Sequence, residues 1–416
     1  MTHYINLILL LLALSGCTTQ TTTLDIANLN VKTIPVPAAA GSAQPSLFTG
    51  LDDTVYLSWI ESNTEQNSTL KFSLLGEQGW SNPSVIVQDN QLLSNWADFP
   101  SLTELNDGSL VAYWPTKNPR GGFATDVNIA FSQNNGTSWS KPIIAHQDGT
   151  ATEHGFVSLL PWGNDQLLTV WLDGRNKDTT MLRSAVFSNR GKRIRTSELD
   201  ANTCTCCQTS AALLSNKRAM VAYRDHDNNE KRDMSYILID DQQQSKPMPL
   251  FDDNWIIGAC PVNGPVIANH GQLIATAWYA APDNQPEIKV NFSTDGGNTF
   301  EKPIRIDGGK PMGRVDQVML DDGSVVVSWL EQDETDAHIR VGHIHQNGSM
   351  AAPRLLTLSS VSHASGFPRI TRTKTDLIFA WVDFGKPTMV KSARIPIHQF
   401  LAEESKKEPE DKAPLK

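Results

Sequence analysis

The chain has 416 residues, of which 35 are Lys or Arg and 45 are Asp or Glu, so its formal net charge is −10. This balance argues against nucleic acid as a partner and predicts a soluble surface that does not attract polyanions. The chain is long for one ordinary hydrophobic core, and a fold built by repetition would explain that length within a single domain.

The first 17 residues are predicted to be a processing segment and not part of the fold. Ile5–Leu14 is an apolar run too short to cross a membrane as a helix, and Leu14-Ser15-Gly16-Cys17 follows it. This tetrapeptide resembles the bacterial lipobox, which implies that Cys17 is lipidated and becomes the first residue of the mature chain. The alternative is an ordinary signal peptide with an incidental cysteine.

The same resemblance bears on the location of the protein. Thr18 stands where an Asp would retain a lipoprotein at the inner membrane, so the resemblance implies a lipid anchor in the cell envelope, at the outer membrane. Residues 18–28 are Thr-rich and polar, and we interpret them as a tether. At the other end, residues 399–416 are rich in Glu, Lys and Pro, and are predicted to be a disordered charged tail.

Between these ends, one pattern repeats along the chain. An apolar strand ends in an aromatic residue and then turns polar or acidic, at intervals of about 51 to 57 residues. The repeated aromatic residues are Trp59, Trp114, Trp171, Tyr223, Trp278, Trp329 and Trp381. The pattern predicts an all-β fold over residues 29–398, a β-propeller with seven blades of three to four antiparallel strands, with six blades as the alternative. A strand around Leu29–Val36 would complete the last blade and close the ring.

A second motif marks the turns between strands. One copy reads Ser293-x-Asp295-x-Gly297-x-Thr299-Phe300, and a second copy runs from Ser132 to Trp139. The motif resembles the Asp-box, or BNR repeat, of the sialidase-like β-propellers, and the stretches TCTCCQT and CPVNGP look like those of an uncharacterised bacterial branch of such proteins. The resemblance speaks for the fold and much less for the reaction, because a fold hosts many functions.

Four cysteines remain besides Cys17. If the chain is exported, Cys204, Cys206, Cys207 and Cys260 lie in an oxidising compartment, where disulfides are favoured. The two stretches precede the inner strands of adjacent blades, so we expect Cys260 to bond to Cys206 or Cys207, with the remaining two as a second bridge. The alternative is a copper, zinc or redox site. We expect no cofactor and no metal.

Polar side chains gather where a propeller has its ligand sites. Residues just before each inner strand and just after each repeated aromatic converge on one mouth around the axis. The candidates there are Asp98, Glu153, His154, Asp173, Arg175, Arg224, His226, Arg314, Asp316 and Glu331, with Trp96 and His363 beside them. The simpler interpretation is that such charges pair with one another at strand ends.

The sialidase resemblance implies hydrolysis of a terminal acidic sugar. Three arginines would clamp the substrate carboxylate, and Arg175, Arg224 and Arg314 are the candidates. Asp98 or Asp173 would be the acid, and Glu153 or Glu331 the partner of a nucleophilic Tyr. His154, His226, Asp316 and Glu331 would contact the substrate. The sequence departs from the family where Gln44-Pro45-Ser46-Leu47 replaces its Arg-Ile-Pro, and no Tyr is predicted at the mouth.

Two other functions fit the same residues. A polysaccharide lyase uses a His/Tyr pair and an Arg beside a uronate carboxylate, and His154, His226 and Arg224 suit that chemistry. A propeller without catalysis would bind a glycan or an envelope protein. In every case we expect a monomer, anchored to the membrane by lipid, that meets a glycan or an envelope protein.

Overall fold

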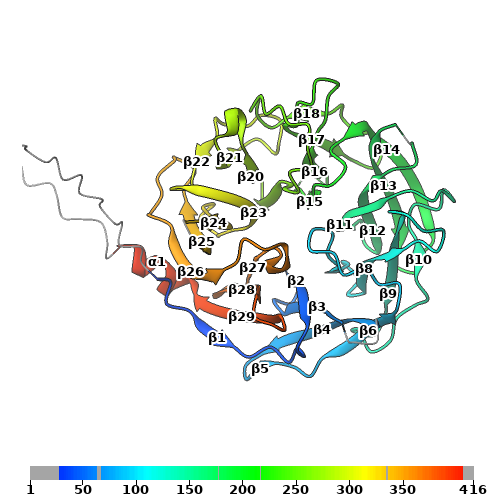
Figure 1. Ribbon diagram of the computed structural model, residues 1–416, viewed down its shortest axis with the longest axis horizontal. Coiled ribbons are helices and arrows are strands. Elements are labelled where there is room, and N and C mark those ends of the chain that lie inside the picture. Colours follow the sequence, from blue (N-terminus) through cyan, green and yellow to red (C-terminus); the bar gives the residue numbers. More distant parts are fainter. Residues whose placement is uncertain (1–27, 63–66, 177, 216, 334–335, 406–416) are drawn as a thin grey trace, which may run out of the picture.

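The computed structural model describes residues 28–62, 67–176, 178–215, 217–333 and 336–405. Within these ranges the strands form seven antiparallel sheets arranged in a ring around a central axis (Figure 1). The predicted seven-bladed β-propeller is therefore confirmed. The predicted signal peptide, the lipidation residue Cys17 and most of the predicted tether lie outside the described residues.

Each blade runs outward from an inner strand in chain order. The strands of blades 1 to 3 are β2 (Ser42–Thr49), β3 (Val55–Ser62), β4 (Ser68–Gly76), β5 (Gly79–Trp80) and β6 (Ser84–Asp89); β7 (Ser101–Glu104), β8 (Leu110–Lys117), β9 (Thr125–Ser132) and β10 (Ile143–Ile144); and β11 (His154–Trp162), β12 (Gln166–Asp173), β13 (Thr180–Ser188) and β14 (Arg193–Thr203). Those of blades 4 and 5 are β15 (Ser210–Leu213), β16 (Ala219–Arg224), β17 (Met234–Ile239) and β18 (Met248–Pro249); and β19 (Val266–His270), β20 (Leu273–Ala280), β21 (Glu287–Ser293) and β22 (Ile304–Arg305).

Blades 6 and 7 complete the ring. Their strands are β23 (Lys310–Met319), β24 (Val325–Gln332), β25 (Ala337–Ile344) and β26 (Arg354–Ser359); and β27 (Arg369–Arg372), β28 (Asp376–Asp383), β29 (Met389–Pro396) and β1 (Lys32–Ile34). Because β1 pairs with β29, strands from the two ends of the propeller share one sheet, as predicted. Two 3₁₀ turns (Pro282–Asn284 and His363–Ser365) and helix α1 (Ile397–Ser405) are the other elements.

The core lies between the blades. The repeated aromatics are buried as predicted, and Trp171 of blade 3 packs in one cluster with Val111 and Tyr113 of blade 2. The ring closes in the same way, because Trp59 of blade 1 packs with Ile378 and other residues of blade 7. Each blade therefore buries its faces only against its neighbours, as a propeller requires.

The two turns that carry the sequence motif are built alike. The Ser293 hydroxyl accepts the Gly297 N–H at 3.0 Å, and the Asp295 carboxylate accepts the Thr299 N–H at 3.0 Å. The Thr299 backbone bond and its hydroxyl lower the pKa of Asp295 to about 2. In the other copy, Ser132 accepts the Gly136 N–H at 2.8 Å. The motif thus closes a tight turn, with glycine in the left-handed region that it tolerates best.

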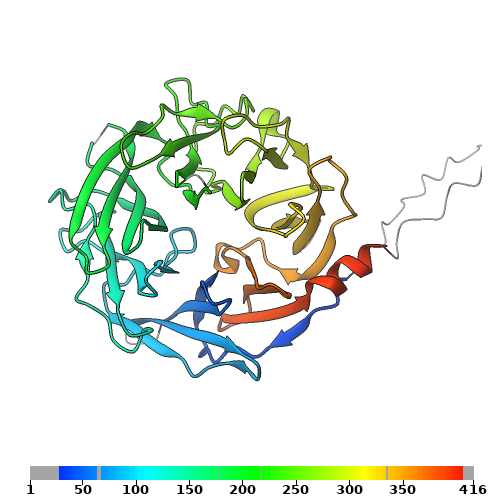
Figure 2. The same ribbon diagram turned by 180° about the vertical axis from the view of Figure 1, so that it is seen from behind.

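The predicted disordered tail is wrong for residues 399–405, which belong to α1 on the outer rim (Figure 2). Phe400 is fully buried in the cluster shared by blades 6 and 7, under the Arg354 guanidinium. Glu404 pairs with Arg354 at 2.9 Å and with His343 at 2.7 Å. The apolar residues of α1 form one short stripe within a charged segment, and this stripe is too short for its helical periodicity to predict a helix from the sequence. Residues 406–416 lie outside the described part of the chain.

Gly264 sets how closely blades 4 and 5 approach at the mouth. A Cβ added there would lie 1.9 Å from the Gln208 carbonyl oxygen, which is backbone and cannot swing away. We expect Gly264→Ala to lower the free energy of unfolding by about 3 kcal/mol or more, measured by chemical denaturation. Gly258→Ala is the control, because a Cβ at Gly258 has no described heavy atom within 4 Å. Equal stability of the two variants would contradict this close packing.

Candidate functional site

A cavity of about 620 Å³ runs along the axis of the ring, between the inner strands of all seven blades. Its lining includes Asp98 and Phe99 from the loop before β7, Gln208 from the loop before β15, and Asp316 and Arg369 from blades 6 and 7. Gln208 links the loops of three blades at the mouth. Its side chain donates to the Ala97 carbonyl at 2.6 Å and accepts the Gly264 N–H at 3.1 Å. The cavity is thus concave, polar and held by rigid elements.

Asp98 is the most distinctive group on the cavity wall. Its Oδ1 accepts the Tyr113 hydroxyl at 2.7 Å and the Phe156 N–H at 3.0 Å. Gly155 makes room for the carboxyl, because a Cβ there would lie 2.2 Å from the Asp98 Oδ2. Burial raises the pKa of Asp98 to about 7, against the two hydrogen bonds and with a smaller contribution from the Glu153 charge. Near neutral pH this carboxyl can therefore both donate and accept a proton.

The shifted pKa of Asp98 makes stability depend on pH. The folded protein holds the proton up to about pH 7, whereas the unfolded chain releases it near the ordinary value of 3.8. This contribution to stability is complete below the unfolded pKa and is lost as the pH rises through the folded pKa. Asp98→Asn cannot ionise at this position. We therefore expect the free energy of unfolding of the wild type to fall relative to that of Asp98→Asn by about 2–3 kcal/mol as the pH rises from about 5 to about 8. Denaturation curves at the two pH values measure this, and a constant difference would contradict the assignment.

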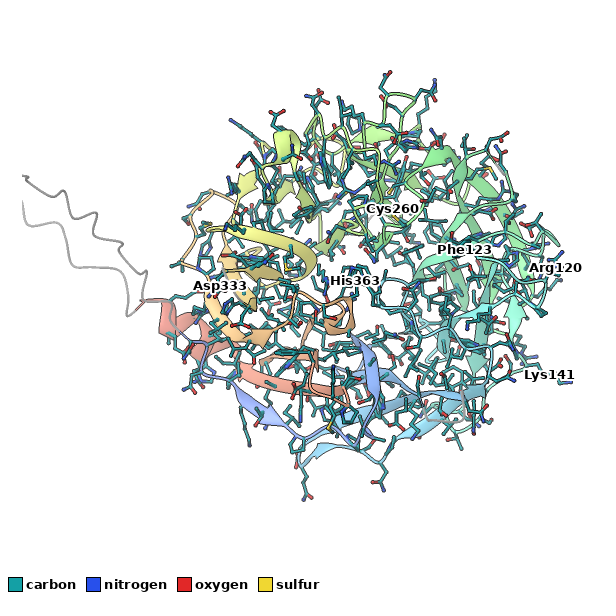
Figure 3. All side chains as sticks on the ribbon, in the orientation of Figure 1. Arg120, Phe123, Lys141, Cys260, Asp333 and His363 are labelled. Carbon is teal, nitrogen blue, oxygen red and sulfur yellow. The ribbon has the colours of Figure 1, made fainter. Side chains whose placement is uncertain are left out.

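Aromatic and cationic side chains form a platform at the mouth. Trp96 stacks on His363 with ring centroids 4.4 Å apart, and the Arg314 guanidinium lies 4.9 Å from the Trp96 ring. Phe99 lies under the Arg369 guanidinium at 5.0 Å. His363 is exposed and stands beside the central opening (Figure 3). We call Trp96, Phe99 and His363 the mouth platform.

Asp316 and Arg369 form an ion pair on the cavity wall. The Arg369 Nε lies 3.1 Å from the Asp316 carboxylate, which also accepts the N–H groups of Gln317 and Ile370. Burial raises the pKa of Asp316, and Arg369 opposes that effect. The sequence predicted a site role for Asp316 but missed Arg369, Phe99 and Tyr113. Arg369 lies only two residues after Phe367, at the start of an inner strand, and that position was the available signal.

The three arginines predicted as a carboxylate clamp do not converge on the cavity. Arg224 is 1% exposed, and its guanidinium donates to the carbonyls of Asn263, Arg232 and Tyr279 at 2.6–3.0 Å. Arg314 donates to Ser365 and to the Gly366 carbonyl, and burial lowers its pKa to about 10. Arg175 pairs with Asp173 at 2.7 Å. These interactions cross-link loops, so the predicted clamp is not assembled in this structure.

Two of the predicted acids have a structural task. The indole N–H of Trp171 donates to Asp173 at 2.7 Å, and that of Trp329 donates to Glu331 at 2.9 Å. Trp59 donates to Glu61 in the same way at 2.8 Å. The acid two residues after the repeated Trp therefore satisfies a buried donor. It does not reach the cavity lining, and the sequence pattern alone could not distinguish this task from catalysis.

His154 belongs to a buried polar cluster behind the cavity wall. Its ring stacks on His146 at 3.7 Å, and Asp148 lies 2.9 Å from His154 and 3.0 Å from His146. Burial acts to lower the pKa of His154, but Asp173 and Asp148 outweigh it and raise that pKa. Burial and His154 together lower the pKa of His146. His146, Asp148 and His154 lie close enough together to hold a metal ion, but the ring nitrogens and the carboxylate already face one another.

The other predicted contacts lie away from the cavity lining. His226 pairs with Glu230 at 3.1 Å on the hairpin between β16 and β17. Glu153 is exposed in the loop just before β11, close enough to Asp98 to influence its pKa. Of the ten predicted site residues, the cavity therefore gathers Asp98 and Asp316.

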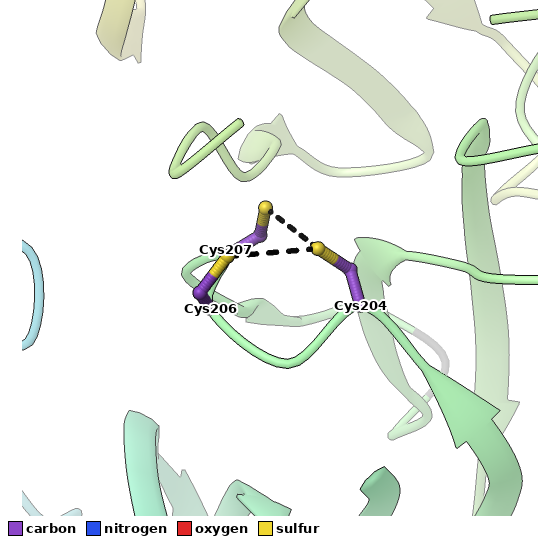
Figure 4. A group of neighbouring side chains, drawn as sticks. All are labelled: Cys204, Cys206 and Cys207. Carbon is purple, nitrogen blue, oxygen red and sulfur yellow. Dashed lines mark hydrogen bonds between the residues drawn. The ribbon is translucent and has the colours of Figure 1, made fainter. Parts of the chain in front are cut away.

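The four remaining cysteines gather at the mouth as free thiols, and the predicted disulfides are not formed in the structure. The Sγ atom of Cys204 lies 3.2 Å from that of Cys207 and 3.9 Å from that of Cys206 (Figure 4). Cys260 contacts the Thr205 hydroxyl at 3.4 Å. The expectation that the two stretches meet at adjacent blades is therefore correct.

Helices long and apolar enough to cross a membrane are not found among the described residues. No family model and no curated protein matches the chain. Among solved structures, an ulvan lyase bound to -[GlcA(1-4)Rha3S]- matches with a TM-score of 0.58 and 9% identity, over 87% of this chain and 95% of that one.

Two further structures extend the comparison. A protein of unknown function from Dyadobacter fermentans matches with a TM-score of 0.50 and 14% identity, over 89% of this chain and 96% of that one. The NanB sialidase from Streptococcus pneumoniae gives 0.46 and 13%, over 89% and 70%. At these identities the likeness concerns the fold and not the reaction. The chain is a seven-bladed β-propeller whose fold is similar to those of an ulvan lyase and of a protein of unknown function.

Proposed function

We propose that the protein acts on an acidic glycan in its central cavity, with Asp98 as the general acid/base. The observation that carries this proposal is a buried carboxyl with a pKa of about 7 on the wall of a polar cavity. Such a group costs stability above neutral pH, and shifts of this kind cluster at functional sites. The mouth platform supports a sugar ligand, because the apolar face of a pyranose packs on an aromatic ring while its hydroxyls stay hydrated.

The charges around the cavity bear on the class of glycan. The Arg314 guanidinium lies over the Trp96 ring, so positive charge lies within the mouth platform, whereas Arg369, over Phe99, is paired with Asp316. Arginine beside a sugar platform favours a carboxylated or sulfated ligand. The ulvan lyase of the same fold, bound to a glucuronate-containing saccharide, is consistent with a uronate as the substrate.

A second candidate is a propeller that binds a glycan without cleaving it. One observation favours it: the charges at the mouth pair off, as in Asp173–Arg175 and Asp316–Arg369. Under this alternative Asp98 serves only to hold the irregular start of β11 at Phe156.

The test measures binding and turnover of oligosaccharides by the chain from Thr18 onward. The panel contains uronate oligomers, a sialic acid reporter and neutral oligomers, and products are followed by mass spectrometry. We expect an acidic oligomer to bind and be cleaved, and Trp96→Ala to weaken that binding by about tenfold, since aromatic contacts dominate such sites. Phe123→Ala is the matched control, because that ring is 92% exposed on the loop between β8 and β9 and is not part of the mouth platform. Binding without cleavage would favour the second candidate. Equal effects of the two variants on affinity would contradict a sugar-binding role for the mouth platform.

We also propose that the mature chain begins at a lipidated Cys17 and is held at the outer membrane. The lipobox-like stretch before Cys17 supports this. Mass spectrometry of the N-terminal peptide from the native host tests it. A diacylglyceryl adduct on Cys17 is the expected result, and an unmodified terminus elsewhere in residues 15–30 would indicate an ordinary signal peptide.

A further inference from the structure

The cysteines come from two loops that the fold holds together. Cys204, Cys206 and Cys207 lie between β14 and β15, and Cys260 lies between β18 and β19. The close approach of Gly264 to Gln208 brings these loops into register at the mouth. Figure 3 shows Cys260 on the inner side of the ring, near the opening. The cluster therefore spans blades 4 and 5 next to the cavity, and the proposed function makes no use of it.

The geometry of the sulfur atoms fits ligands that share one ion. Cys204 and Cys207 are 0% and 2% exposed. The Sγ atoms of Cys204, Cys206 and Cys207 all lie within 4.8 Å of one another. Four sulfurs bound tetrahedrally at about 2.3 Å would be roughly 3.8 Å apart. The Cys204–Cys206 distance of 3.9 Å matches that spacing, and the Cys204–Cys207 distance of 3.2 Å is shorter than it but far longer than the roughly 2.0 Å of a disulfide.

Positive charge lies beside the sulfurs. The Arg232 Nη1 is 3.5 Å from the Cys204 Sγ, and the same guanidinium donates to the Ile257 carbonyl at 2.9 Å and pairs with Glu230 at 2.8 Å. The buried Arg224, the last residue of β16, donates to backbone carbonyls, and no carboxylate among the described residues pairs with it. Three or four thiolates around one ion carry net negative charge, and these guanidinium groups would offset it.

We propose that Cys204, Cys206 and Cys207 bind a thiophilic metal ion, Cu⁺ or Zn²⁺, with Cys260 as the fourth ligand where the ion requires four. Thiolate sulfur selects these ions over hard cations. Each ligating thiol loses its proton to solvent when the ion binds, so no oxidant or reductant enters the step. The bound ion would clamp the mouth loops of blades 4 and 5 beside the cavity.

The two ions differ in the part that Cys260 plays. Zn²⁺ in a structural site takes four ligands, so its binding would need Cys260. Cu⁺ held by three sulfurs would not need Cys260 as a ligand. Cys260→Ser therefore distinguishes them: a large loss of Zn²⁺ affinity with Cu⁺ affinity retained identifies the three buried sulfurs as the Cu⁺ ligands.

The experiment uses the chain from Thr18 onward, purified under reducing conditions. Titration with Zn²⁺, and separately with Cu⁺ against a colorimetric chelator, gives stoichiometry and affinity, and elemental analysis gives the content after gel filtration. We expect one ion per chain for at least one metal and a loss of affinity of at least about tenfold in Cys206→Ser. Cys206 is half-buried, so this variant disturbs packing less than a change at the buried Cys204. Circular dichroism confirms that each variant is folded.

Thiol counting under denaturing conditions separates this proposal from the disulfide alternative. Four reactive thiols in protein isolated from the envelope, with bound metal, support the proposal. A mass lower by two hydrogens per bridge and a thiol count below four would overturn it. Unchanged affinity in Cys206→Ser, or metal content far below one per chain after titration, would also overturn it.

Discussion

Arg224→Ala is expected to lower the free energy of unfolding by about 3–5 kcal/mol. The guanidinium donates to three backbone carbonyls, two of them through fully buried hydrogen bonds, and truncation removes the donor from all three acceptors. The change also removes the packing of the guanidinium over the Trp255 ring, 4.7 Å away. Urea denaturation followed by tryptophan fluorescence measures the difference.

The matched control for this prediction is Arg193→Ala, which removes an exposed guanidinium from the outer strand β14. Its expected effect is within about 0.5 kcal/mol. If Arg224→Ala were as stable as Arg193→Ala, the cross-link between the loops of blades 4 and 5 would be refuted. A loss of activity in Arg224→Ala reports on folding, so that variant cannot by itself identify a substrate-binding arginine.

Asp98→Asn is expected to reduce turnover of the acidic oligomer by about 10²–10⁴-fold, with little change in affinity. Removing a general acid/base costs that much when the rest of the site is intact. The Asn Oδ1 can still accept the Tyr113 hydroxyl and the Phe156 N–H, so the loop geometry is preserved. Steady-state kinetics across pH measure this. The turnover rate of the wild type should change its dependence on pH near the Asp98 pKa of about 7, and the turnover rate of the variant should show no such change.

Asp165→Asn is the control for this rate effect. Asp165 is exposed on the hairpin between β11 and β12, outside the cavity lining. Equal turnover in Asp98→Asn and Asp165→Asn would leave Asp98 with a structural role only. The glycan-binding propeller without catalysis would then be the better account.

The repeat of the sequence was enough to predict the architecture, because the period of the aromatics is set by the packing of each blade on the next. Trp59, Trp171 and Trp329 are buried between blades wherever the pattern places them. The closing strand β1 was predicted for a related reason, since an unpaired edge on the last blade would be exposed.

The site was harder to predict, because position in the repeat does not say which way a side chain points. Asp173 and Glu331 follow the repeated Trp and turn back to its indole N–H, whereas Asp98 turns to the cavity. Arg224 looked available at a strand end but is covered by the loop at Asn263. Arg369 and Phe99 meet only through the ring closure, so the contacts between them depend on long-range geometry.

A crystal structure of Asp98→Asn with the acidic oligomer that the wild type cleaves or binds tests directly whether the central cavity is the glycan site. We expect the saccharide in the central cavity, with one sugar ring on the mouth platform. Either a glycosidic oxygen should lie within hydrogen-bonding distance of residue 98, or a ring C–H group should contact it. A saccharide bound only at the outer rim, or on a blade edge away from Trp96, would contradict it.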